Sequence, residues 1–439
     1  MTAPTRILAI ADSDSYLKWG AALLARAPED WERSLVILAS PVLPSPDQID
    51  AALVGSSAPP PVILDLSALA VRIAALEPDV VLIAVRGPLV KVIVRAIVGA
   101  ARRRPVIVSG LPGISIPATR MAIAHRAQAD LVVLHSRREV RDFGELARRI
   151  QHDQRFALAT LPFLVHAQLD AGQPGSGDLI FAAQAKVPPR REDRLLLLGW
   201  LVQAARNAPD RRVVVKVRAA AGEAQTHAEQ HEYSALLSSM SDVPENLVVE
   251  GGAMAQHLSG AAGLVTVSST AAIEAVALSV PVLALADFGV DAELINPVFE
   301  GSGLFGDAAD LAAWRFHSPE REWLDDNYFH GVEQDDWVGA IEALLAIRES
   351  SVFPLKPLKH GLAGGRLRRA WDRKVALGRF DRSYAGLVAL LVGVPARAVY
   401  HTIRRIGAAI SPRPAELSED LREAGELVAA NEVGKGEAR

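Results

Sequence analysis

Short apolar runs alternate with longer stretches whose apolar residues recur at helical spacing. The first half of the chain holds these strand-like runs: RILAIA (6–11), SLVILA (34–39), PVILDL (61–66), DVVLIAV (79–85), PVIVSG (105–110), ADLVVLH (129–135) and FALATLP (156–162). Helical patterns such as YLKWGAALLARA and VKVIVRAIVGAARRR lie between several of them. Continuous apolar strands separated by helices predict a parallel sheet that is covered on both faces.

The same alternation restarts after HAQLDAGQPGSGD (166–178), a stretch rich in Gly that predicts an interdomain linker. The later strand-like runs are LIFAAQ (179–184), RRVVVKVR (211–218), NLVVEG (246–251), GLVTV (263–267) and PVLALAD (281–287). The pattern predicts an α/β protein of two Rossmann-like, doubly wound domains, at 1–165 and 179–318. Ligands of such sheets bind beyond the carboxyl ends of the strands, so the predicted site is the cleft between the domains.

Charge is unevenly distributed along the 439 residues. Residues 356–413 hold thirteen Lys/Arg and two Asp, a net charge of +11, whereas 414–439 hold three basic and seven acidic residues, a net of −4. We predict a helical segment over 319–413 that ends in this basic stretch, followed by an acidic, disordered tail. The basic stretch favours two alternatives equally: docking on an anionic membrane surface, or helices that pack back on the N-terminal domain.

Several classes of protein and site lose their support from the sequence. The chain has no cysteine, which excludes disulfides, thiolate zinc sites and cysteine nucleophiles. The N-terminus lacks a signal-peptide pattern, and no apolar run reaches the roughly 18 to 20 residues that span a bilayer, so we expect a cytoplasmic protein. The GLPG loop at 110–113 lacks the Gly-x-Gly-x-x-Gly spacing of a dinucleotide-binding turn, and the sequence has no P-loop motif and no nucleic-acid recognition motif.

The stretch TVSSTAAIEAV (266–276) combines the end of an apolar strand at Thr266, the three consecutive hydroxyl residues 268–270 and a helical pattern. A strand-to-helix turn of this kind presents backbone N–H groups and hydroxyls to an anion such as a phosphate. The alternative is a helix N-cap with no ligand, because Ser and Thr are preferred caps. The sequence leaves both open at this point.

Its neighbours carry a resemblance to a known family. With KVR (216–218), NLVVEGG and EAVALSVPV, the second half resembles the GT-B glycosyltransferases, most closely the bacterial capsule and polysialic-acid type, and also uncharacterised actinobacterial glycosyltransferases. The resemblance implies a nucleotide-sugar substrate, with CMP-sugars somewhat ahead of UDP-sugars, and synthesis of a cell-envelope glycan. It implies that Ser268, Ser269 and Thr270 contact the donor phosphates with Lys216, and that Arg218 replaces the histidine of a Lys-x-His-Pro motif.

Other positions are assigned with the help of the same resemblance. Glu274 matches the distal glutamate of the retaining GT-B motif, but Thr266 stands at the proximal position, which favours an inverting mechanism without a metal. We expect Asp287 on the side of the donor sugar or base. The polar loop after residue 218 adds three more candidates for that side: Glu223, Thr226 and His227. No cofactor and no metal site are predicted.

An inverting transferase needs a base for the acceptor hydroxyl. ADSDSY follows the first strand, and we take Asp14 as the first candidate and Asp12 as the second, with an N-cap as the alternative role of either. The resembled family places an acidic residue after a later strand, where this chain has Ser109. Two further functions stay open: a sugar-nucleotide 2-epimerase of similar fold, which needs more acid/base carboxylates in the cleft, and a non-catalytic membrane-associated GT-B-like protein.

Overall fold

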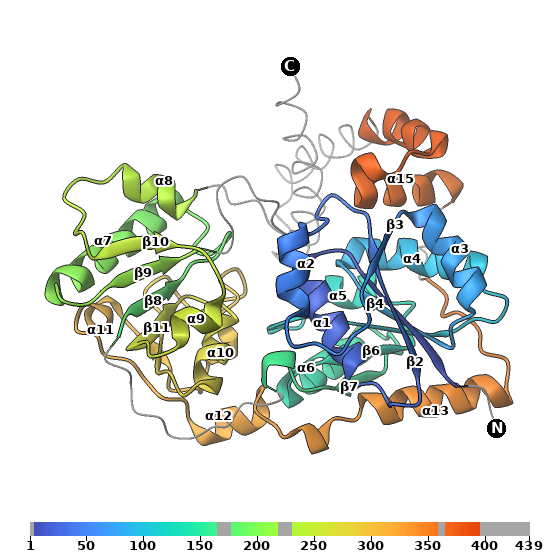
Figure 1. Ribbon diagram of the computed structural model, residues 1–439, viewed down its shortest axis with the longest axis horizontal. Helices are drawn as coiled ribbons and strands as arrows, with labels where there is room; N and C mark the ends of the chain where they lie inside the picture. Colours follow the sequence, from blue (N-terminus) through green and yellow to red (C-terminus); the bar gives the residue numbers. More distant parts are fainter. Residues whose placement is uncertain (1–3, 165–176, 218–230, 359–364, 396–439) are drawn as a thin grey trace.

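Two parallel sheets flanked by helices lie side by side in the computed structural model (Figure 1). The structure describes residues 4–164, 177–217, 231–358 and 365–395. Each sheet is of the doubly wound type, so the predicted fold class is confirmed. The linker predicted at 166–178 falls almost entirely outside the described residues, as does the acidic tail at 414–439.

The N-terminal sheet has seven parallel strands in the order β3-β2-β1-β4-β5-β6-β7. Their bounds are β1 Arg6–Ala11, β2 Glu32–Leu38, β3 Val62–Leu64, β4 Val80–Ala84, β5 Val106–Gly110, β6 Leu131–Leu134 and β7 Phe156–Leu158. The helices are α1 Asp14–Ala25, α2 Pro46–Leu53, α3 Leu66–Leu76, α4 Gly87–Ala100, α5 Arg120–His125 and α6 Arg137–Arg149. The strand order reverses between β1 and β4, and a crevice opens at the carboxyl ends of strands at such a switch point.

Alternate residues of the same strand enter different cores. Ile7 and Ala9 of β1 pack with α1, whereas Leu8 and Ile10 pack on the other face with α3, α4 and α6. This two-sided burial is the physical reason why the strands appear in the sequence as continuous apolar runs.

The C-terminal sheet has six parallel strands in the order β10-β9-β8-β11-β12-β13, with its switch point between β8 and β11. Their bounds are β8 Leu179–Ala182, β9 Val213–Lys216, β10 Leu247–Glu250, β11 Gly263–Thr266, β12 Val282–Leu285 and β13 Phe305–Gly306. The helices are α7 Arg191–Asn207, α8 Tyr233–Ser238, α9 Met254–Leu258, α10 Ala271–Ala277 and α11 Ala308–Ala312. Every strand predicted from the sequence is present, and β13, which has only two residues, is the strand that the apolar pattern misses.

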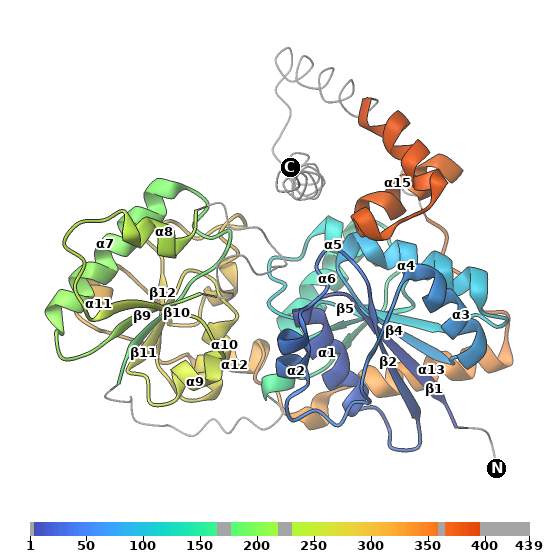
Figure 2. The same ribbon diagram turned by 45° about the horizontal axis from the view of Figure 1, so that its top comes forward.

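After the second sheet the chain returns to the first domain. The helices of this part are α12 Arg321–Asp326, α13 Trp337–Ser350 and α15 Arg366–Leu377, and residues 384–395 are also helical. Trp337, Ile341 and Leu344 of α13 belong to the same core as β1 and α1. Figure 2 shows α15 beside α4, and Ala376 and Leu377 of α15 are buried in the same core as α4. Within the basic stretch 356–413, the alternative in which the helices pack back on the N-terminal domain is therefore realised for α15.

Candidate functional site

The switch point of the C-terminal sheet holds a hydrogen-bonded pair of side chains. Gln184 follows β8, Ser268 follows β11, and these strands are neighbours. The Gln184 Oε1 accepts the backbone N–H of Ser268 at 3.0 Å, and the Gln184 Nε2 donates to the Ser268 Oγ at 3.0 Å. Ser268 is buried, so its hydroxyl helps to fix the turn, and the next two residues are the more accessible ones.

The turn before α10 is also held from within. Ser269 donates its backbone N–H to the Thr266 Oγ1 at 2.9 Å, and its Oγ accepts the backbone N–H of Ala271 at 3.2 Å. The N-cap alternative is thus realised in part, through Ser269, whereas Thr270 at the N-cap position makes no side-chain cap hydrogen bond. Thr266, which breaks the retaining motif, is buried and shapes this turn.

The remaining predicted donor-side residues are spread along the same sheet edge. Lys216 ends β9, is 6% exposed, and donates from Nζ to the carbonyl of Val217 at 2.7 Å. Because β8 lies between β9 and β11, Lys216 and Ser268 flank Gln184 from opposite sides. Asp287 follows β12, is exposed, and accepts the backbone N–H of Ala308.

Glu274 lies on α10 and is half-buried. The other predicted donor-side residues lie outside the described residues: Arg218, Glu223, Thr226 and His227. In the described ranges, no group of three or more His, Asp or Glu side chains is arranged to hold a metal ion.

The switch point of the N-terminal sheet holds a buried ion pair. Asp12 follows β1, is 0% exposed, and accepts from the Nε of Arg86 at 2.8 Å and from its backbone N–H at 3.1 Å. Burial raises the pKa of Asp12, and the charge of Arg86 opposes that rise. With both carboxylate oxygens bound to Arg86, Asp12 is poorly placed to accept a substrate proton.

Asp14 is the more accessible of the two candidate bases. It is half-buried and begins α1, and because Ser13 is the N-cap residue, the alternative role of Asp12 or Asp14 as the N-cap is not realised. Ser109 cannot substitute as an acid, and its Oγ donates to the carbonyl of Ile83 at 2.9 Å inside the sheet. The geometry therefore keeps Asp14 ahead of Asp12.

A second polar group lies beneath the same edge of the N-terminal sheet. Arg126 is buried; it donates to the Tyr16 hydroxyl at 2.9 Å and to the carbonyl of Gly110 at 3.0 Å. Burial raises the pKa of Tyr16. No sequence motif points to Gln184, Arg86 or this pair. The available signal for Gln184 and Arg86 was a single polar residue directly after an apolar strand.

The carboxyl edges of the two sheets meet in the structure. A Cβ built on Gly113, in the loop after β5, would lie 3.4 Å from the Thr270 Oγ1 at the start of α10. Ile116 of the same loop is buried in one core with Ala271 and Ala272. The donor-side turn and the N-terminal domain are thus in direct contact.

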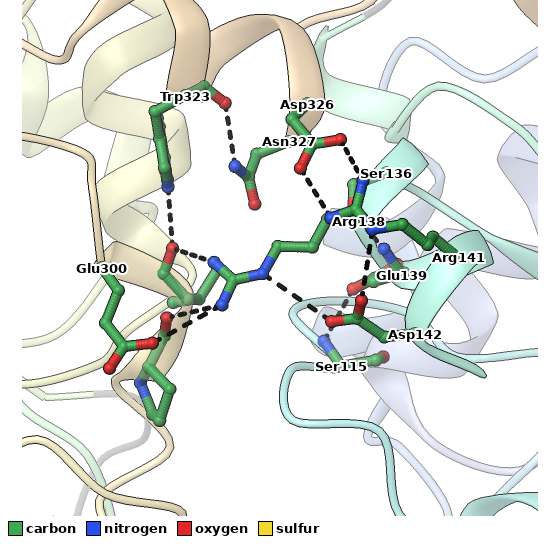
Figure 3. A network of polar contacts seen from close by, with 12 residues as sticks. Ser115, Ser136, Arg138, Glu139, Arg141, Asp142, Glu300, Trp323, Asp326 and Asn327 are labelled. Carbon is green, nitrogen blue, oxygen red and sulfur yellow. Dashed lines mark hydrogen bonds and ion pairs between the residues drawn. The ribbon is translucent and has the colours of Figure 1, made fainter. Parts of the chain in front are cut away.

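A network of polar contacts from α6 holds the domains in this arrangement (Figure 3). Arg138 donates to the carbonyl of Pro297 at 3.1 Å, and both terminal nitrogens of Arg141 bind the carboxylate of Asp326 at 2.8 Å. Glu139 is buried; it accepts from the Tyr328 hydroxyl at 2.7 Å and, at 2.8 Å, from a backbone N–H in the loop after β5. Burial raises the pKa of Glu139 to about 7.

Two surface hollows lie away from both switch points. One, of about 570 Å³, lies along α6 and is lined by residues such as Asp142 and Arg149. The other, of about 420 Å³, lies between α7 and α11 beside Trp314. Neither contains a residue that the sequence or the strand order assigns to the site, so the two carboxyl edges remain the candidate.

Family comparison covers both sheets and the contact between them. Residues 7–344 match the family described as "Putative glycosyltransferase (DUF6716)". The chain belongs to this family. The region matched to DUF6716 runs from β1 to α13, so it includes both switch points. No curated protein sequence matches the chain.

Solved structures share the two-domain fold at low sequence identity. The "putative UDP-N-acetylglucosamine 2-epimerase from Listeria monocytogenes" is 15% identical, with a TM-score of 0.55 over 81% of this chain and 100% of that one. The "S. aureus MnaA-UDP co-structure" is 11% identical, with a TM-score of 0.50 over 78% of this chain and 95% of that one. A UDP-glucosyltransferase from Polygonum tinctorium is 13% identical, with a TM-score of 0.46 over 80% of this chain and 100% of that one. The first two confirm the fold of this DUF6716 chain.

Proposed function

We propose that this protein is a glycosyltransferase that takes a nucleotide-sugar donor at the β8/β11 switch point. The observation that carries the proposal is the packing of the loop after β5 against the start of α10, because it brings the carboxyl edges of the two sheets together. A donor held by one sheet can then meet an acceptor held by the other. Membership of the DUF6716 family supports the same activity.

In this proposal the accessible Ser269 and Thr270 bind the donor phosphates, and Gln184 positions the turn through Ser268. Lys216 offsets charge that develops on the departing nucleotide. Contacts that strengthen as that charge develops accelerate the reaction. Asp14 removes the acceptor proton, and Arg86 holds Asp12 beside it. The mechanism is inverting and needs no metal.

The proposed product is a glycan of the cell envelope, made at the cytoplasmic face of the membrane on a glycan or lipid-linked acceptor. The sequence resemblance favours a CMP-sugar, whereas the two solved structures of similar fold are named for UDP or a UDP-sugar. Calorimetric titration with CMP, CDP and UDP distinguishes these donors. Absence of binding by all three at millimolar concentration would contradict the transferase proposal.

A sugar-nucleotide 2-epimerase is the second candidate, since the structures with TM-scores of 0.55 and 0.50 include a protein described as an epimerase. Epimerisation at C2 breaks a C–H bond. Incubation with UDP-N-acetylglucosamine in D₂O, followed by proton NMR, therefore tests it directly. Deuterium at C2 would identify an epimerase, whereas an unchanged C2 proton together with nucleotide binding supports the transferase.

A further inference from the structure

The helix at residues 384–395 packs on the rest of the chain through its small residues. Ala389 is fully buried. A Cβ built on Gly393 would lie 2.2 Å from the ring of Trp371 in α15, and one on Gly386 would lie 2.4 Å from the carboxylate of Asp381. Close approach on this face requires the glycines, so the larger side chains of the helix are left on the other face.

The outward face of this helix is formed by aliphatic side chains and one tyrosine. Tyr384 is 87% exposed and Leu391 is 76% exposed. The other large exposed side chains are Leu387, Val388, Val392 and Val394. Residues 384–395 contain no charged side chain. A contiguous exposed apolar surface of this kind is uncommon on a soluble protein and marks an interaction site.

Positive charge is concentrated in the same part of the chain as this face. Residues 365–395 contain seven Lys/Arg and two Asp, a net charge of +5. Both aspartates are buried in ion pairs: Asp372 binds Lys91 at 3.2 Å, and Asp381 binds Arg373 at 3.2 Å. The exposed charged residues of this part are arginines: Arg366, Arg368, Arg369, Arg379 and Arg382, of which Arg368 also pairs with Asp372 at 3.0 Å. Asp65, at the start of α3, lies within electrostatic reach of Arg382 and offsets part of its charge.

We propose that the apolar face of residues 384–395 inserts into the surface of an anionic lipid bilayer, with the exposed arginines of residues 365–395 bound to lipid headgroups. An apolar helix face beside basic residues matches the layered chemistry of such a surface, with acyl chains beneath a negatively charged headgroup layer. A second copy of the chain fits less well, because a symmetric dimer through this face would bring the arginines of both copies together. No helix in the described residues is long and apolar enough to cross a bilayer.

The helix at residues 384–395 packs on α15, which in turn is bound to the N-terminal domain, the acceptor-side domain in the proposed function. Asp372 of α15 binds Lys91 of α4 and lies 3.4 Å from Arg95 of the same helix. Leu377 of α15 is buried against this domain. Docking would therefore hold the N-terminal domain, with Asp14, near the membrane. This surface is separate from the nucleotide site, so vesicle binding and nucleotide binding can fail independently.

The experiment is co-sedimentation of the full chain with large unilamellar vesicles. One set contains phosphatidylcholine alone, and the other contains about 30% phosphatidylglycerol. The test variant is Leu391→Glu. The matched control is Leu196→Glu, which makes the same change at a 51% exposed leucine on α7 of the other domain. Both substitutions are at exposed positions, and equal melting temperatures would show that both variants fold.

We expect the unchanged protein to bind the phosphatidylglycerol vesicles and to bind phosphatidylcholine alone much more weakly. Leu391→Glu should reduce binding at least about tenfold, because a carboxylate must enter the acyl layer. Leu196→Glu should bind like the unchanged protein. Raising the salt to about 1 M, where the Debye length is only about 3 Å, should weaken the binding of the unchanged protein to the phosphatidylglycerol vesicles.

Two results would overturn the proposal. The first is a failure of the unchanged protein to bind anionic vesicles, or binding by Leu391→Glu that is as strong as that of the unchanged protein. The second is a stable dimer in light scattering that Leu391→Glu dissociates, because this would assign the apolar face to a second copy of the chain.

Discussion

Replacement of Arg86 by Met tests the buried ion pair at the N-terminal switch point. The change leaves the Asp12 carboxyl group fully buried, without the guanidinium 2.8 Å away. Removal of one partner of a buried pair costs about 3–5 kcal/mol. We take the lower end, about 3 kcal/mol, because the Arg86 side chain is itself 16% exposed and water can relax around the site. This is a large share of the roughly 5–15 kcal/mol that stabilises a typical domain.

The measurement is urea unfolding at pH 5 and pH 8, followed by circular dichroism. Without Arg86, the pKa of Asp12 rises further above its unfolded value. A carboxyl group with a raised folded pKa contributes stability that is fully present below the unfolded pKa and is lost as pH rises through the folded pKa. The deficit of Arg86→Met against the unchanged protein should therefore be larger at pH 8 than at pH 5. Adding Asp12→Asn should recover part of the loss. A deficit under about 1 kcal/mol at pH 8 would refute this account of the pair.

Three further substitutions test the packing of the domains. Glu139→Gln removes a carboxyl group whose burial raises its pKa to about 7. The loss of stability that the unchanged protein undergoes between pH 5 and 8 should therefore be smaller in the variant. Parallel pH profiles of the two proteins in urea unfolding would contradict this. Trp337→Ala opens a cavity where an indole that is 2% exposed packs in the same core as β1. The substitution should lower the free energy of unfolding by about 3–5 kcal/mol. A loss under about 1 kcal/mol would mean that α13 is not part of that core. Arg141→Gln breaks a bidentate ion pair with Asp326 in which the Arg141 side chain is 50% exposed. The loss of stability in thermal unfolding should therefore stay at about 0.2–1 kcal/mol. A loss above about 2 kcal/mol would indicate that this interface is buried.

The strands could be predicted because burial of both faces of a sheet selects apolar residues at consecutive positions of each strand. β1 is covered on both faces, so RILAIA is apolar after Arg6, and GLVT of β11 is likewise apolar up to Thr266. β13 has only two residues, too few to make an apolar run. The boundaries differ by a few residues where polar residues end the hydrogen bonding, as at Asp65, which caps α3 and does not continue β3.

The site could be predicted only where a short sequence motif indicates it. The hydroxyl residues after β11 were found because three of them stand together at a strand-to-helix turn. Gln184 and Arg86 are single polar residues after apolar strands, and their importance comes from partners 84 and 74 positions away in the chain. The packing of the loop after β5 against the start of α10 depends on how the two domains are arranged, which no local pattern encodes.

The most direct test of the nucleotide site is calorimetric titration of three proteins with UDP and CMP: the unchanged chain, Ser269→Ala and Ser238→Ala. Ser238 is an exposed serine on α8 of the same domain and serves as the matched control. We predict that the unchanged chain and Ser238→Ala bind one nucleotide equally. Ser269→Ala should bind it at least about tenfold more weakly, since a hydrogen bond to a charged phosphate contributes about 1.5–3 kcal/mol. Equal affinity of Ser269→Ala, with its fold intact, would contradict the assignment of the donor phosphates to the β8/β11 switch point.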